Sequence, residues 1–269
     1  MATHGSRLAP AKTRQAGWWK RRLTPERIAP VVAGLILMAF WEVYVRTQLP
    51  DFVATPIGIV MAIPSTLAAP SFWSDTLSSL GSIVQGVAIG TVAGILVGVA
   101  MGRVREFDWF LSTYIRALYA LPLIALVPIV IIWVGYQPEA RLTIVVISAF
   151  LPVAVTTADG TRAIPKEYLD VGQMFGAKAR HVWFGIALPT ALPHIVAGIE
   201  LGFARGITNA IAVEVLASVK GMGMSVFEKS GQLNDNASLV YVLALAIFAV
   251  GIRTLMVRSR QRLAPWYSR

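Results

Sequence analysis

Apolar residues gather in six long runs along the chain, and shorter polar breaks separate one run from the next. A helix needs about 20 mostly apolar residues to cross the hydrocarbon core of a bilayer, and each run is close to that length or longer. The pattern therefore predicts an all-α integral membrane protein with about six transmembrane helices. The predicted spans lie near residues 28–48, 77–101, 110–135, 140–158, 190–215 and 237–257.

The composition supports a lipid bilayer as the surroundings of this chain. Of its 269 residues, 56% are hydrophobic and 14% are charged, whereas about a quarter of the residues of a soluble domain are charged. The first run is too long for a cleaved signal peptide, and no small-residue cleavage site closes it before the polar break. We therefore expect a retained membrane anchor.

The distribution of Lys and Arg predicts how the chain is oriented. Residues 1–27 carry seven of them and the end of the chain from Arg253 carries five, whereas the stretch between Thr47 and Gly102 carries none. Because loops rich in basic residues stay on the cytoplasmic side, we expect both termini in the cytoplasm. The net charge of +10 fits this topology better than a nucleic-acid interface, since the basic residues lie at the chain ends and in the breaks between runs. The expected parts are a basic cytoplasmic segment (1–27), a transmembrane domain (28–258) and a basic cytoplasmic tail (259–269).

Glycine recurs at every fourth position in the second predicted span. Without side chains in the way, another helix can approach such a face closely. We expect this face to pack against another span of the same chain, with a subunit interface or a substrate path as the alternatives. The glycines are Gly86, Gly90, Gly94, Gly98 and Gly102.

Prolines interrupt two of the predicted spans. Pro122 and Pro128 lie in the third, and Pro152 lies in the fourth. Because an internal proline frees a backbone carbonyl and bends a helix, these residues predict a curved bundle that lines a cavity.

The polar segment between the fourth and fifth spans, residues 161–189, has the pattern of an amphipathic helix. Pro165 suits a first helical turn, and Gly176 predicts a bend between two short helices. Such an element either lies on the bilayer surface or docks into a groove of another protein, and the pattern alone favours neither. Its apolar stripe consists of Tyr168, Val171, Phe175, Ala179 and Val182.

The spacing of this segment resembles the "EAA" loop of permease subunits from binding-protein-dependent ATP-binding-cassette (ABC) importers. In that loop a glycine is followed by nine residues and then by Ile-x-Leu-Pro, as Gly176 is followed here by Ile186, Leu188 and Pro189. The resemblance implies that the segment is a cytoplasmic coupling helix, which sits in a cleft of the ATPase. The residues expected to couple the two subunits are Glu167, Asp170, Val171, Gly172, Gly176, Ala177, Leu188 and Pro189, with Asp170, Val171 and Gly172 at the Glu-Ala-Ala positions.

Three further stretches are similar to the nitrate, sulfonate and taurine branch of these permeases. They are LPLIALVPIVIIWVG (Leu121–Gly135), the fifth-span sequence ALPTALPHIVAGIELGFARGITNAIAVEVL followed by GMG (Gly221–Gly223), and a closing Pro265-Trp266. The arginine that these proteins usually carry before the second-span glycines is Ser82 here. The resemblance covers roughly residues 50–266.

This resemblance implies a type I ABC importer permease in the inner (cytoplasmic) membrane of a bacterium. Its implied partners are a second permease copy in a homodimer, two ATPase subunits and an extracytoplasmic solute-binding protein. That protein is expected to dock on Pro50 to Ser74 and Ser218 to Asn236. The implied solute is a small anion or zwitterion, of the sulfonate, taurine, nitrate or aromatic carboxylate class.

Ionisable residues inside the fifth span are candidates for the translocation path. Such residues are costly at membrane depth, so they normally face a bundle interior or a water-filled path and have a partner. In the structural interpretation, Glu200 and Arg205 pair with each other or with Arg116 and Asn209. In the functional interpretation, Arg205 supplies positive potential to a path used by anions. The candidate path residues are Glu200, Arg205, Asn209 and Glu214.

The chain lacks the sequence motifs of several kinds of activity. The chain has no G-x-x-x-x-G-K-[ST] phosphate loop, so we expect ATP to bind a partner subunit and this chain to hold no cofactor. It has no cysteine and three scattered histidines, so no metal site is expected. No catalytic residues are predicted, because no span presents paired carboxylates with a base or a nucleophile with an oriented histidine. The alternative function is a secondary transporter or channel without an ATPase, for which two matching halves with discontinuous helices would be expected.

Overall fold

The computed structural model describes residues 25–164, 167, 174–177, 181, 185 and 188–263, and the regular structure of this part of the chain is helical. Five helices of the described residues are long and apolar enough to cross a membrane. A bent pair makes a sixth span if it is counted as one: α4 (Arg105–Ala120), followed by the 3-10 helix η2 (Leu123–Leu126) with α5 (Val127–Val134). An all-α protein with about six spans is therefore confirmed for the described residues. The five long helices are α1 (Pro25–Gln48), α3 (Pro70–Arg103), α6 (Pro138–Arg162), α9 (Leu188–Leu216) and α11 (Asp235–Leu263).

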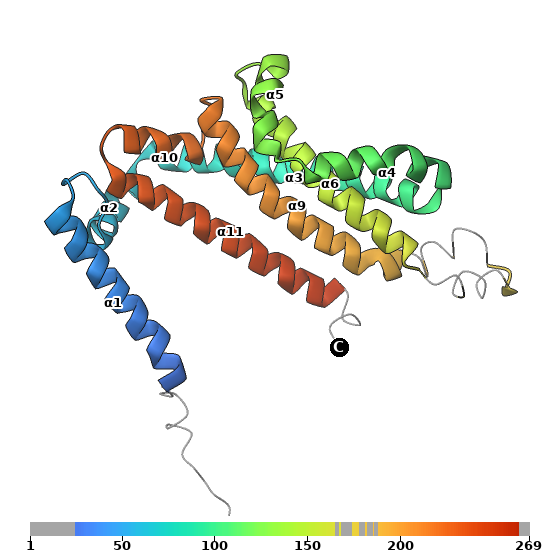
Figure 1. Ribbon diagram of the computed structural model, residues 1–269, viewed down its shortest axis with the longest axis horizontal. Helices are drawn as coiled ribbons and strands as arrows, with labels where there is room; N and C mark the ends of the chain where they lie inside the picture. Colours follow the sequence, from blue (N-terminus) through green and yellow to red (C-terminus); the bar gives the residue numbers. More distant parts are fainter. Residues whose placement is uncertain are drawn as a thin grey trace, which may run out of the picture.

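The third predicted span is broken in its middle rather than continuous. The two halves meet at an angle of 95°, and α5 stands away from the long axis of the bundle (Figure 1). Leu121 has an extended backbone, with ψ of 142°, as expected for a residue before proline, and Pro122 has no N–H to continue the helix. Pro152 lies inside α6 without ending it. The prolines therefore break the third predicted span but not the fourth.

Helix α6 forms the centre of the bundle, between α3 and α9. An added Cβ at each of the five predicted glycines of α3 would come within 2.9 Å of an α6 atom, so the two helices touch through their backbones. Gly198 and Gly202 of α9 approach α6 in the same way. The contacts run from Gly86 with Val145 to Gly102 with Thr161, which means that α3 and α6 point in the same direction. The expected packing against another span of the same chain is confirmed.

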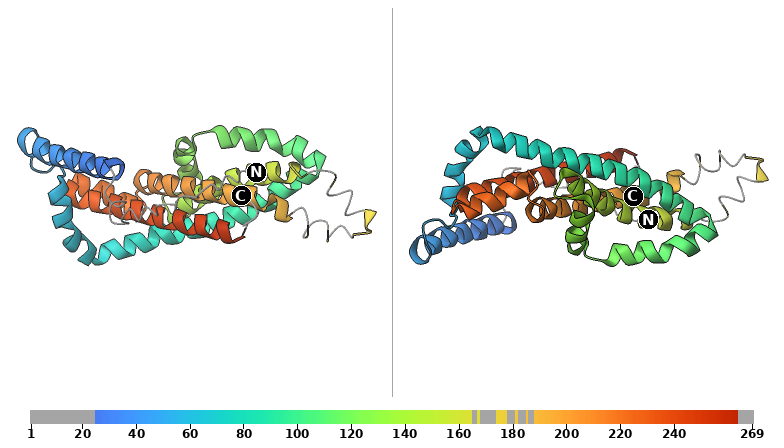
Figure 2. Two further views of the ribbon diagram at one scale, coloured as in Figure 1. Left: turned by 90° about the horizontal axis from the view of Figure 1, so that it is seen from below. Right: turned by 90° about the horizontal axis from the view of Figure 1, so that it is seen from above.

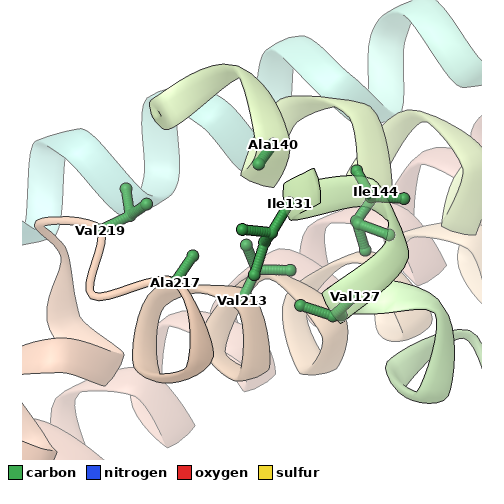
Figure 3. Close-up of a cluster of buried hydrophobic side chains, with 8 residues drawn as sticks. Val127, Ile131, Ala140, Ile144, Val213, Ala217 and Val219 are labelled. Atoms are coloured by element: carbon green, nitrogen blue, oxygen red, sulfur yellow. The ribbon is translucent and has the colours of Figure 1, made fainter. Parts of the chain in front are cut away.

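Helix α5 is held against the bundle by a buried apolar cluster (Figure 3). The cluster joins α5 to the start of α6, the end of α9 and the turn after α9. Its members are Val127, Val130, Ile131, Ala140, Ile144, Val213, Ala217 and Val219. The break in the third span is therefore a packed feature of the fold.

Two short helices occupy one end of the bundle, which we call the α10 end. They are α2 (Pro56–Ala68) and α10 (Met222–Gly231), and neither was predicted as a separate helix. The α3–α4 turn, the end of α6 and the start of α9 lie at the opposite end (Figures 1 and 2).

Helix α1 extends away from the other helices (Figure 1). Only 6% of its most apolar window is buried, and the Glu42 carboxylate ties it to α2 by accepting a bond from Ile57 N at 3.0 Å. Its apolar surface is therefore suited to lipid or to another protein. Most of the predicted basic segments 1–27 and 259–269 lies outside the described residues.

Candidate translocation path and coupling segment

The coupling segment is described at only a few positions. Asp170, Val171 and Gly172 lie outside the described residues. Gly176 has φ of 69°, a left-handed conformation that favours glycine, which agrees with the predicted bend. Glu167 is exposed and Ala177 is half-buried.

The described part of this segment also exposes apolar side chains. Met174 and Phe175 precede the Gly176 bend and are 86% and 87% exposed. Leu188 and Pro189 form the first turn of α9. The segment is therefore joined directly to the helix that carries the four candidate path residues.

Glu214 lies in a closed polar cluster at the α10 end. Its side chain is 0% exposed. One carboxylate oxygen accepts bonds from the Ser79 hydroxyl at 2.6 Å and from Arg141 Nη1 at 2.8 Å, and the other accepts from Gly223 N at 2.7 Å. We call Ser79, Arg141, Glu214 and Gly223 the Glu214 cluster. Glu214 thus contributes to helix packing rather than to an open cavity.

Arg141 was not predicted as a site residue, yet it links α6 to α9, to the turn after α9 and to α3. It is 2% exposed, and besides Glu214 it donates to the carbonyl oxygen of Lys220 at 2.9 Å and to the Ser82 hydroxyl at 2.7 Å. Ser82 lies on α3, next to the glycines that pack against α6. The Arg141 guanidinium therefore joins α6 to α3.

The backbone of the GMG sequence (Gly221–Gly223) packs against the Glu214 carboxylate. An added Cβ at Gly221 would lie 2.3 Å from the carboxyl carbon of Glu214, so a side chain there would collide with it. Met222 N donates to the Ser79 hydroxyl at 2.8 Å. The motif therefore fixes the start of α10 to both α3 and α9.

Arg205 lies beside the break in the third span. Its guanidinium is 4.2 Å from the ring centroid of Tyr119, and Nη1 donates to the Tyr119 carbonyl oxygen at 3.2 Å. That carbonyl belongs to the last turn of α4, where the helix no longer supplies N–H partners. Arg205 therefore caps the broken end of α4.

A cavity of about 480 Å³ opens at this point. Asn209, one helical turn beyond Arg205, donates to the Ser148 hydroxyl at 2.9 Å. Within the described residues, no carboxylate lies within 4.0 Å of the Arg205 guanidinium. The cavity is lined by Tyr119, Ala120, Leu121, Pro122, Leu123, Ala204, Arg205, Thr208 and Asn209.

Glu200 lines a second cavity on a different side of α9. This cavity, of about 620 Å³, lies between α9 and α11, is mainly apolar and also contains Arg253. The expected partner Arg116 forms an ion pair with Asp159 at 2.6 Å. The structure thus places Glu200 and Arg205 in two neighbouring cavities, which share Ala204 and Thr208 in their linings.

The ends of α4 and α6 are joined by a chain of ion pairs opposite the α10 end. Arg162 binds both Asp108 of α4 and Asp159 of α6, and Asp159 also binds Arg116. These charges are partly exposed, so each pair adds little stability. Among the described residues, no group of three His, Asp or Glu side chains could hold a metal ion.

Comparison with known proteins places this arrangement among membrane transporters. Residues 86–269 match the family described as "Binding-protein-dependent transport system inner membrane component". The taurine transport system permease protein TauC of Escherichia coli is 26% identical over 258 residues, which are 93% of each chain. The formylaminopyrimidine transport permease protein ThiX of Halalkalibacterium halodurans is 24% identical over 242 residues, 90% of this chain and 96% of that protein. The putative aliphatic sulfonates transport permease protein SsuC of Bacillus subtilis is 22% identical over 266 residues, 97% of this chain and 91% of that protein.

A solved structure shares the fold. One chain from the crystal structure of an amino acid ABC transporter with histidines superposes with a TM-score of 0.59 at 13% identity. The match covers 79% of this chain and 99% of that chain. The expected type I importer fold is therefore confirmed.

Proposed function

The chain belongs to the family of binding-protein-dependent transport system inner membrane components, and we propose that two copies of it form the path by which an ATP-driven importer moves a small anionic solute. A permease subunit does not itself hydrolyse ATP in this proposal, because the chain lacks a phosphate loop. Two partner ATPases supply the energy. A solute-binding protein delivers the solute from outside.

The observation that carries this proposal is the broken third span beside Arg205. Irregular backbone at membrane depth is tolerated only where protein or water satisfies its polar groups. Here the break borders a cavity that also contains a guanidinium, an amide and the Thr208 hydroxyl. Such surroundings suit a water-filled path better than lipid, and a second copy facing the cavity would close it.

The coupling segment connects this path to the ATPases. With both termini in the cytoplasm, residues 161–189 are cytoplasmic, and the exposed Met174 and Phe175 suit a groove of a partner protein. Leu188 begins α9, the helix that carries Arg205. A displacement of the segment by the ATPases would therefore move Arg205 and its cavity.

The charge of the solute is inferred mainly from the cavity. Two relatives are named for taurine and for aliphatic sulfonates, all of which carry a sulfonate group, but a third is named for formylaminopyrimidine. Family membership therefore leaves the charge open, and the guanidinium of Arg205 favours an anion.

ATP hydrolysis by the purified complex tests this function. We expect a small ATPase to be encoded beside the permease gene and to co-purify with the permease, and the loaded binding protein should stimulate hydrolysis. A permease that binds no ATPase and transports in response to an ion gradient alone would instead support the secondary transporter.

A further inference from the structure

Arg205 differs from Arg141, the buried arginine of α6, in its charge balance. Arg141 is enclosed and paired with Glu214 at 2.8 Å. Arg205 is only half-buried, and no carboxylate of the described residues lies within ion-pair distance of it. A cation at membrane depth normally has a countercharge, and the described residues supply none to Arg205.

The guanidinium keeps hydrogen-bond donors available for such an anion. It has five N–H groups, and its hydrogen bond within the described residues uses Nη1 toward the Tyr119 carbonyl. The Tyr119 ring at 4.2 Å holds the group in place. A positioned guanidinium with free donors matches the oxygens of a carboxylate or sulfonate in geometry as well as charge.

The cavity supplies space and further polar groups. Its volume of about 480 Å³ falls within the range of small-molecule sites. The side chains of Thr208 and Asn209 line it, and Asn209 is held by its bond to Ser148. No hydrogen bond among the described residues uses its other amide hydrogen or its carbonyl oxygen, so both can contact polar atoms of a solute.

We propose that the permease itself carries an oxyanion-binding site, in which Arg205 binds the charged group of the solute at the broken end of α4. The proposal rests on the function proposed above, because it assumes that this cavity is part of the path. The ligand class is a small organic or inorganic oxyanion, and the chemistry shared by sulfonates and carboxylates defines it. The membrane subunit thus contributes to solute selection in addition to the binding protein.

Charged thiol reagents test the site on the assembled complex. The chain has no native cysteine, so Thr208→Cys introduces a single target in the cavity. If the Arg205 charge lies about 6 Å from the new thiol in a wet cavity, it favours an anionic reagent over a cationic one by about tenfold. We therefore expect methanethiosulfonate ethylsulfonate to react about tenfold faster than its trimethylammonium counterpart, relative to the same ratio at the exposed control Ser65→Cys.

A second substitution in the Thr208→Cys variant tests whether Arg205 causes the preference for the anionic reagent. Adding Arg205→Gln should abolish it, whereas Arg205→Lys should retain most of it. An unchanged preference in the Gln variant, or no reaction of Thr208→Cys with either reagent, would overturn the site.

A competition experiment keeps Arg205 intact and so does not depend on how its variants fold. Methanesulfonate should slow labelling of Thr208→Cys, and dimethyl sulfone, an uncharged molecule of similar shape, should not. Equal effects of the two molecules would contradict an oxyanion site. Stimulation of ATP hydrolysis by the loaded binding protein, measured on the unlabelled complex, reports separately on the proposed function.

Discussion

Two arginines in the membrane-spanning helices have opposite surroundings, and different effects of mutation follow. Arg141 lies with Glu214 in a closed cluster, and its polar partners come from α3, α9 and the turn after α9. Arg205 lies in an open cavity against an aromatic ring and one carbonyl oxygen. Loss of Arg141 should damage the fold, and loss of Arg205 should damage transport.

We predict that Arg205→Gln lowers solute uptake about tenfold while the complex still assembles. Glutamine can still donate to the Tyr119 carbonyl, but it carries no charge. Uptake assays and gel filtration of the detergent-extracted complex would measure the two effects. Arg205→Lys is the matched control, because it keeps the charge. Loss of assembly that Glu200→Gln restores would show instead that the two residues are structural partners.

We predict that Arg141→Gln destabilises the protein by about 3–5 kcal/mol, because it leaves the buried Glu214 carboxylate without its cation. Glu214→Gln added to this variant should recover part of the loss. Thermal unfolding of the detergent-solubilised protein gives the comparison. Arg116→Gln is the control, since its pair with Asp159 is 47% and 46% exposed and should contribute at most about 1 kcal/mol. Equal effects at the two arginines would contradict the structural role of the Glu214 cluster.

The sequence predicted which residues are candidates for the site, but it did not predict the side chains that they contact. Arg205 and Glu214 stood out because ionisable residues are rare inside apolar runs. Their environments could not be predicted, because Tyr119 is 86 positions away from Arg205 and Arg141 is 73 positions away from Glu214. These contacts depend on how the helices pack.

At the scale of elements, the glycines of α3 leave no room for added volume against α6. We predict that Gly90→Ala destabilises the protein by about 1–3 kcal/mol, because the new Cβ would lie 2.5 Å from the Val146 carbonyl oxygen. Gly81 lies on the same helix with nothing within 4 Å of such a Cβ. Gly81→Ala should therefore be neutral or stabilising. Thermal unfolding would measure both, and equal destabilisation would refute the close packing.

The coupling segment should depend on the bend at Gly176. Valine there would force a β-branched residue to adopt φ of 69°, which is strained. We predict that Gly176→Val leaves the spans inserted but uncouples ATP hydrolysis from uptake. Gly185→Val is the control, because an added Cβ at that position meets open space. Full substrate-stimulated ATPase activity and uptake in Gly176→Val would show that the bend is not needed for coupling.

Long elements were predictable from the sequence, and short or broken ones were not. The spans around α6 and α9 follow from runs of apolar residues, which is a local property. Helix α10 has no such run, and its start is fixed by the contacts of Met222 and Gly223 with distant helices. Pro122 indicated a bend in the third span, but the angle of 95° depends on the apolar cluster that holds α5.

At the scale of the whole molecule, the basic residues at both ends of the chain predict that both termini are cytoplasmic. A thiol reagent that cannot cross the membrane should label Ser65→Cys from outside and Ser259→Cys from inside only. Whole cells and inverted vesicles provide the two sides. Labelling of Ser259→Cys in intact cells would contradict six spans with both termini in the cytoplasm.

The proposed role of this permease is to provide the translocation path of an ATP-driven importer. Solute uptake into proteoliposomes that contain the permease and its ATPases tests it most directly, with the loaded binding protein outside and ATP inside. The solute would be the anion that the binding protein retains on purification. We predict uptake only when ATP and the binding protein are both present. Uptake by the permease alone, driven by an ion gradient and independent of ATP, would contradict the account.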